Sequence, residues 1–181
     1  MRLLTLAATT LLTACATVSN VPGEAPWTTG RLSLRVEATA NEPTRSLSAG
    51  FELRGDGISG ELHLNSPLGN HMAAARWSPT AVTLTTPEGE HAYASLDELS
   101  RKALGETLPL AALPDWLSGR PWQQAPFMSL QTQAGATAGF EQLGWQISLA
   151  RRAEGWIEAR REAPPAVLLR VKLDGHEVNA P

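Results

Sequence analysis

Residues 46–69 read "SLSAGFELRGDGISGELHLNSPLG", and their pattern is the decisive evidence for the predicted fold. Every second residue from 47 to 53 is apolar, and polar residues or glycine lie between them. The segment "RGDG" at 54–57 interrupts this pattern, which then returns with Leu62 and Leu64. A period of two is typical of a strand with one apolar and one solvated face, and glycine with aspartate is typical of a turn. The stretch therefore predicts an antiparallel hairpin.

The same alternation recurs on both sides of this hairpin. Short turn sequences such as "WSPT" at 77–80 and "TPEGE" at 86–90 join the segments in sequence order, which favours an antiparallel meander over a sheet with crossover helices. About ten strands are expected, in residues 30–37, 46–54, 61–65, 72–77, 82–84, the segment after residue 90, 137–142, 144–152, 155–161 and 166–175.

Between the two groups of strands the apolar period becomes helical. A capping box begins at Ser95, and its helical spacing ends at Gly105. A second helical patch covers residues 109–119, where Pro114 lies inside the pattern and can split it. These elements predict a mainly β domain with a few helices: a highly curved sheet or unclosed antiparallel β-barrel with the helices across its open side. Alternation alone leaves open whether its interior is a packed core or an apolar cavity.

The chain begins with a predicted secretory signal peptide, residues 1–14. Arg2 precedes an apolar run at 3–12 that is too short to span a bilayer. "LTAC" at 12–15 resembles a bacterial lipobox, which predicts that Cys15 is acylated; an ordinary signal peptide with a cysteine near its cleavage site is the alternative. Cys15 is the only cysteine, so it has no disulfide partner within the chain. Ala16 follows it in place of the aspartate that often marks inner-membrane lipoproteins, which favours the outer membrane.

Residues 15–26 are predicted to be the lipidated N-terminus and a tether. This segment lacks any apolar period and contains Pro22, Gly23 and Pro26. Fully extended, about eleven residues reach about 35 Å, which would keep the domain close to the bilayer surface. Residues 27–181 then form one domain.

The sequence offers little for catalysis. The formal net charge of −3 gives no electrostatic case for nucleic acid. The four histidines lack metal-ligand spacing, and neither a G-x-S-x-G nor a G-x-G-x-x-G motif is present. We therefore predict no catalytic residue, no metal site and no cofactor, and a protein that is not an enzyme.

The end of the decisive hairpin carries an unusual residue. Ser66-Pro67-Leu68-Gly69 is typical of a type I turn, with Pro67 and Gly69 at favoured positions. Leu68 is then expected at the exposed tip. A single exposed leucine is common at protein surfaces, so a residue without a role is one interpretation.

Five segments that span nearly the whole chain can be compared with known families: "LTAC" at 12–15, "GRLSLRV" at 30–36, "LNSPLG" at 64–69, "LPLAALPDWLSGRP" at 108–121 and "FEQLGWQIS" at 140–148. Together, and in this order, they resemble the LolB family of bacterial outer-membrane lipoprotein receptors. The sequence departs from the family at Pro114, which bears on the length of the second helix. Its end, "DGHEVNAP", lacks the tryptophan often found there, which bears on the closure of the last strand.

The resemblance implies an unclosed β-barrel with a helical lid over an apolar cavity. It implies a receptor that accepts lipoproteins from the periplasmic carrier LolA, shields their acyl chains and inserts them into the outer membrane, facing the periplasm and anchored through Cys15. A monomer is expected. The membrane-insertion loop would be Pro67, Leu68 and Gly69. Together with the alternation, the fold resemblance gives as acyl-cavity candidates Leu32, Leu34, Phe51, Leu53, Leu62, Leu64, Val82, Leu84, Trp145 and Ile147, and as lid candidates Leu96, Leu99, Leu113 and Trp116.

Two other functions fit the same residues. One is a lipid-anchored module that binds another apolar ligand. The other is a structural outer-membrane lipoprotein whose interior is a solid core.

Overall fold

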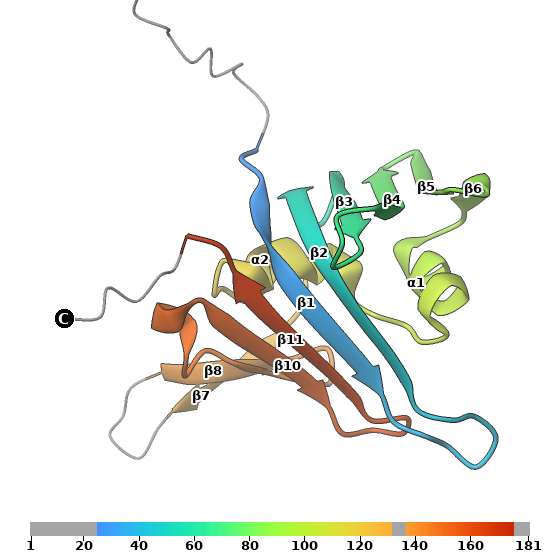
Figure 1. Ribbon diagram of the computed structural model, residues 1–181. Helices are drawn as coiled ribbons and strands as arrows, with labels where there is room; N and C mark the ends of the chain where they lie inside the picture. The colour runs from blue at the N-terminus through green and yellow to red at the C-terminus, as the bar shows by residue number, and fades with distance from the viewer. Residues whose placement is uncertain (1–24, 132–136, 176–181) are drawn as a thin grey trace, which may run out of the picture.

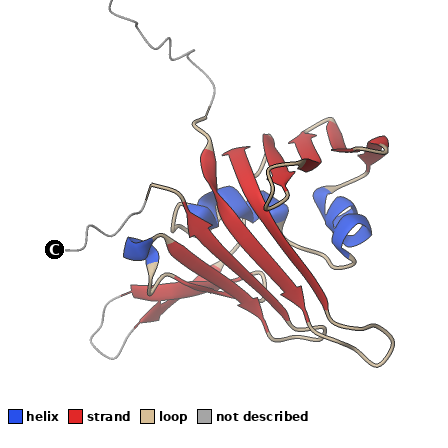
Figure 2. Ribbon diagram, viewed as in Figure 1, coloured by secondary structure: helices blue, strands red, loops and turns tan. Residues whose placement is uncertain are grey.

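A computed structural model of the chain describes residues 25–131 and 137–175. The predicted signal peptide, Cys15 and most of the predicted tether lie outside these residues. Within them the chain forms one antiparallel sheet of eleven strands (Figures 1 and 2). The strands are β1 (Thr28–Val36), β2 (Arg45–Gly55), β3 (Gly60–Asn65), β4 (His71–Ser78), β5 (Ala81–Thr86), β6 (Gly89–Tyr93), β7 (Phe127–Gln131), β8 (Thr137–Gln142), β9 (Trp145–Ser148), β10 (Trp156–Arg161) and β11 (Val167–Leu173).

The strands follow a meander that is joined in the middle by the two ends of the domain. Their order is β6-β5-β4-β3-β2-β1-β11-β10-β9-β8-β7, so β6 and β7 are the two edges of the described sheet. The β1–β11 pair runs from Gly30 opposite Leu173 to Val36 opposite Val167. The prediction of an unclosed antiparallel barrel is confirmed, and β11 pairs with β1 over its full length without a C-terminal tryptophan.

The decisive hairpin forms as predicted. Phe51 pairs with Leu64 and Leu53 with Leu62, which places these apolar side chains on the inner face of β2 and β3. The turn between the strands comprises residues 56–59, two residues later than "RGDG", because Arg54 and Gly55 still pair with Glu61 and Gly60. Asp56 Oδ1 accepts hydrogen bonds from the backbone N–H groups of Ile58 and Ser59, at 2.7 and 2.8 Å. The side chain of Asp56 therefore stabilises the turn locally.

Strand β7 was not expected from the sequence. Its residues, "FMSLQ", show no clear alternation, and four of the five are exposed. A strand at the edge of a sheet that is exposed on both faces has no burial pattern by which to recognise it. Its pairing with β8, from Phe127 opposite Gln142 to Gln131 opposite Thr137, defines it instead.

The helices cover the inner face of the sheet. Helix α1 (Leu96–Leu104) contacts β5 and β6, and helix α2 (Leu113–Leu117) contacts β2 and lies behind it in Figure 1. At the N-cap of α1 the Glu98 N–H donates to Ser95 Oγ at 3.1 Å, as the capping box predicts. Short 3₁₀ helices η1 (Leu110–Ala112) and η2 (Arg152–Glu154) complete the elements.

Pro114 splits the second helical patch as predicted. The chain forms η1 first and then α2, whose first turn contains Pro114. Proline is tolerated at this position because the backbone N–H groups of a first turn have no partner within the helix. The proline therefore shortens α2 without breaking a helical hydrogen bond.

On the outer face of the hairpin, Glu61 is held by three cationic or polar side chains. Burial alone would raise its pKa, but hydrogen bonds from His63, Arg54 and Arg76, at 2.7, 2.9 and 2.8 Å, outweigh burial and lower the pKa to about 2. Its side chain is only 12 % exposed. The ionised form of Glu61 is therefore favoured by folding.

We expect this carboxylate to make stability depend on acid pH. A lowered pKa adds stability above the unfolded value near 4.5, and the added stability is lost as the pH falls toward 2. Between pH 5 and pH 2 the unmodified protein should lose about 2–3 kcal/mol more unfolding free energy than Glu61→Gln. Urea denaturation at a series of pH values measures this difference. Parallel loss of stability in the two proteins would contradict the expectation.

Candidate functional site

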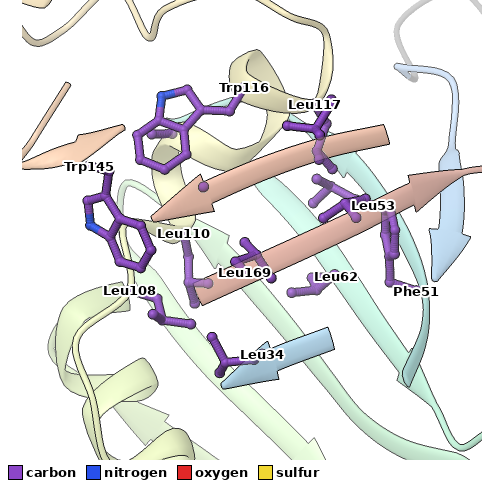
Figure 3. Close-up of a cluster of buried hydrophobic side chains, with 14 of the residues drawn as sticks. Leu34, Phe51, Leu53, Leu62, Leu108, Leu110, Trp116, Leu117, Trp145 and Leu169 are labelled. Atoms are coloured by element: carbon purple, nitrogen blue, oxygen red, sulfur yellow. The ribbon is translucent and has the colours of Figure 1, made fainter. Parts of the chain in front are cut away.

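An apolar cavity of about 50 Å³ lies between the inner face of the sheet and the helices. Strands β1, β2, β3 and β11 form one wall, and the segment from Leu104 to Leu117 forms the other. Figure 3 shows side chains from both walls pointing toward one another, among them Leu34, Leu62, Leu110 and Leu169. The lining of the cavity is entirely apolar: Leu32, Leu34, Leu47, Phe51, Leu53, Leu62, Leu64, Leu104, Leu108, Leu110, Leu113, Leu117, Leu169 and Val171.

The structure brings six of the ten cavity candidates together at this wall. They are Leu32, Leu34, Phe51, Leu53, Leu62 and Leu64. Val82 and Leu84 on β5, and Trp145 and Ile147 on β9, pack in the same hydrophobic core but do not line the cavity. The reason is that alternation identifies the inner face of a strand but not which strands curve over the open space.

The lid candidates divide in the same way. Leu113 lines the cavity, whereas Leu96, Leu99 and Trp116 pack into the core beside it. The lid residues that line the cavity and were not predicted are Leu104, Leu108, Leu110 and Leu117. Leu110 and Leu117 share the helical face of Leu113, so the 3.6-residue period could have identified them. Leu108 precedes η1 and has no such signal.

Two arginines hold the segment that links α1 to η1. Arg45 at the start of β2 donates from Nη2 to the Gly105 carbonyl at 3.1 Å. Arg161 at the end of β10 pairs with Glu106, with Nη2 and Oε1 3.1 Å apart, and reaches the Thr107 carbonyl at 3.4 Å. Within the described residues the buried Nε of each arginine has no hydrogen-bond partner. These contacts fasten the segment over the cavity from β2 and from β10, which flank the central β1–β11 pair. The hydrogen-bonding capacity of the two guanidinium groups is not fully used.

Gln142 on β8 fixes the far end of the lid. Its Oε1 accepts hydrogen bonds from Trp116 Nε1 and from the Trp122 backbone N–H, both at 2.8 Å. Its Nε2 donates to the carbonyls of Trp122 and Ala125 at 2.7 and 2.8 Å. The buried amide of Gln142 thus joins β8 by hydrogen bonds to α2 and to the connection that follows α2.

The turn after β3 displays Leu68 to solvent. The Gly69 N–H donates to the Ser66 carbonyl at 2.8 Å, which closes the turn. Leu68 is 88 % exposed, the largest value among the exposed large hydrophobic side chains of the described residues. Gly69 has a φ of 84°, which glycine adopts without strain. The turn is therefore well defined, and its apolar tip makes no contribution to the core.

The apolar lining suits the cavity to binding apolar groups. In residues 25–131 and 137–175 no three His, Cys, Asp or Glu side chains are grouped so as to hold a metal ion. Over the same residues no helix has the length and hydropathy to cross a bilayer. A cavity lined only by leucine, phenylalanine and valine can bind hydrocarbon through the hydrophobic effect.

Comparison with known proteins gives one family over most of the chain. The family model described as "Outer membrane lipoprotein LolB" matches residues 27–174. An outer-membrane lipoprotein LolB from Bordetella petrii is 35% identical over 163 residues, which are 85% of this chain and 81% of the relative. Its counterpart in Bordetella pertussis is 36% identical over 150 residues, 80% and 75% of the two chains. The protein of the same name in Cupriavidus necator is 30% identical over 167 residues, 88% and 82%.

Proposed function

Since this chain belongs to the LolB family of outer membrane lipoproteins, we propose that it is the receptor that accepts lipoproteins from the periplasmic carrier LolA and inserts them into the outer membrane. The observation that carries this proposal is the wholly apolar cavity between sheet and helices. Three acyl chains contain about 40 methylenes, whose exposure to water costs on the order of 30 kcal/mol. A lipoprotein therefore needs continuous shielding between carrier and membrane.

The lid must move for acyl chains to enter. The cavity of about 50 Å³ is far smaller than a typical small-ligand pocket of about 300 Å³ or more. The inner wall is a hydrogen-bonded sheet, whereas the outer wall is the segment fastened by Arg45 and Arg161 through side-chain contacts. Displacing that segment breaks side-chain hydrogen bonds and uncovers its leucines, which bound acyl chains would cover again, whereas opening the sheet would break the hydrogen bonds between strands. We therefore expect the space to open on the lid side.

Release into the bilayer is the role we propose for the turn at Pro67, Leu68 and Gly69. One leucine inserted into a bilayer gains only about 2 kcal/mol, which is negligible beside a lipid anchor. Leu68 therefore acts at the lipid surface by guiding acyl chains out of the receptor. It does not act as a tether.

The location of the protein in the cell depends on Cys15. We propose acylation of Cys15 and attachment to the periplasmic face of the outer membrane, with residues 15–26 as the link to the domain. The Cys15→Ala protein should be recovered as a soluble periplasmic form or as an uncleaved precursor. Membrane fractionation and mass spectrometry of the mature N-terminus measure this. An acyl group on the Cys15→Ala protein would contradict the assignment.

The function itself is tested by transfer from a loaded carrier. Lipoprotein bound to purified LolA is mixed with the full-length receptor, and the receptor is recovered through an affinity tag. We expect the lipoprotein to move to the receptor and then to added liposomes. Lipoprotein that stays on LolA would exclude the proposed receptor and favour a structural lipoprotein with a solid core.

A further inference from the structure

A groove runs from the outer side of the lid, past the turn between β8 and β9, onto the face of the sheet opposite the lid. It consists of two hollows that share the side chain of Leu143. The first, of about 390 Å³, lies over β7 to β10 and has a mixed lining: Phe127, Met128 and Trp145 are apolar, whereas Glu141, Gln142, Gln146, Arg160 and Glu162 are polar or charged. The second, of about 340 Å³, lies between Leu143 and the lid segment. We call the two hollows and the adjoining edge of β7 the outer groove.

A single thickness of chain separates the second hollow of the outer groove from the cavity. Along residues 104–113, Leu104, Leu108 and Leu110 line the cavity. Thr107, Pro109 and Ala111, which lie between or beside them, line the second hollow. If this segment moves, the cavity and the outer groove become one continuous space.

The two edges of the sheet differ in a way that favours binding at β7. Strand β6 carries Glu90 and His91, and charged side chains of this kind protect an edge from unwanted pairing. Strand β7, "FMSLQ", carries no charge, and Phe127 and Met128 are 52 % and 60 % exposed. Within the described residues it pairs with β8 alone. An uncharged apolar edge of this kind is suited to the addition of an extended peptide.

Leu143 provides a second indication that the outer groove is a binding site. It lies with Gly144 in a two-residue turn between β8 and β9, where both residues have positive φ, 55° and 76°. Such turns favour Asn-Gly, and a leucine there is strained. Leu143 is also 46 % exposed. A strained and exposed apolar side chain at the junction of two hollows indicates a functional constraint, since neither turn formation nor core packing requires it.

We propose that the outer groove binds the peptide that follows the acylated cysteine of a lipoprotein, and that this peptide adds to β7 as an extended strand. The inference rests on the proposed function. A lipoprotein carries its acyl chains on its N-terminal residue, so its peptide begins where the chains end. With the chains in the cavity, the cysteine lies at the displaced segment 104–113, and the peptide continues into the outer groove toward β7. Leu143 packs against it on the way.

The test compares two probes on the full-length receptor. One is triacylated cysteine followed by eight uncharged residues, and the other is triacylated cysteine amide without a peptide. Binding is measured by displacement of a fluorescent fatty acid. Met128→Lys should weaken binding of the peptide-bearing probe at least fivefold and leave the peptide-free probe within twofold. The matched control is Ala92→Lys on the opposite edge, β6, where the residue is also exposed, and it should change neither affinity.

A second measurement uses a photo-crosslinking amino acid in an otherwise unchanged receptor. Placed at Ser129 it should label the peptide of the longer probe, whereas placed at Ala92 it should not. Equal effects of Met128→Lys on both probes, or labelling at Ala92 and not at Ser129, would overturn the proposal that the outer groove binds the peptide. Either result would leave the proposed receptor function intact. A wild-type receptor that binds neither probe would overturn the proposed function, and the outer groove with it.

Discussion

Replacing Gln142 with leucine should lower the free energy of unfolding by about 3–5 kcal/mol. The substitution keeps the approximate volume of the side chain but removes four hydrogen bonds to Trp116, Trp122 and Ala125. The two donors and two carbonyls left behind lie against the core, where an unmade hydrogen bond costs about 1–3 kcal/mol. Partial access of water to Trp122 and Ala125 keeps the total below the simple sum. Urea denaturation followed by tryptophan fluorescence measures the change.

Gln146 provides the matched control for this prediction. It lies on the neighbouring strand β9, is exposed, and donates one hydrogen bond to Glu141 at 2.8 Å. Gln146→Leu should change the free energy of unfolding by less than about 0.5 kcal/mol. Similar stability of the two variants would show that the buried amide does not fix the lid to the sheet.

Replacing Leu68 with glutamate should separate acceptance of lipoprotein from its delivery. The variant should unfold at the same urea concentration as the unmodified protein, because an exposed tip residue buries almost no area. It should still accept lipoprotein from LolA. Incorporation into liposomes should fall at least tenfold, since a carboxylate at the tip is costly to place among acyl chains, and the lipoprotein should accumulate on the receptor.

Ile58→Glu is the control for a charge at another exposed tip. Ile58 is exposed in the turn between β2 and β3, and Leu68 lies in the next turn, between β3 and β4. Consecutive turns of an antiparallel meander lie at opposite ends of the sheet, so the two tips lie apart. We expect normal delivery from this variant. If Leu68→Glu delivered lipoprotein as well as the control, or failed to accept it from LolA, the turn would not be the delivery element.

The sequence was enough to predict the strands whose two faces differ. In β1, β2 and β11 the buried side chains recur every second residue, as in Leu34 and Val36 or Leu169 and Val171, because one face packs on the helices. The same period fails for β7, where Phe127 and Met128 are adjacent and both exposed. Edge pairing, which the sequence does not encode as a burial pattern, decides the structure there.

Which residues hold the lid and which line the cavity depends on contacts between residues far apart in the chain. Arg45 and Gly105 lie 60 residues apart, and Arg161 and Thr107 lie 54 apart, so no local pattern signals that these pairs meet. Val82 and Leu34 have the same alternation, yet only Leu34 lines the cavity. Which strands surround the open space is set by the curvature of the sheet, and curvature follows from the sum of all its pairings.

Photo-crosslinking of lipoprotein acyl chains would show whether the receptor holds them between the sheet and the lid. The crosslinking amino acid is placed at Leu32 or Leu64, which line the cavity, or at Arg31 or Glu52, which are exposed on the outer face of β1 and β2. Each receptor is loaded from LolA with lipoprotein that carries radiolabelled acyl chains. The account predicts strong labelling at Leu32 and Leu64 and background labelling at Arg31 and Glu52. Equal labelling of the two faces would contradict it, because acyl chains would then not be held between the sheet and the lid.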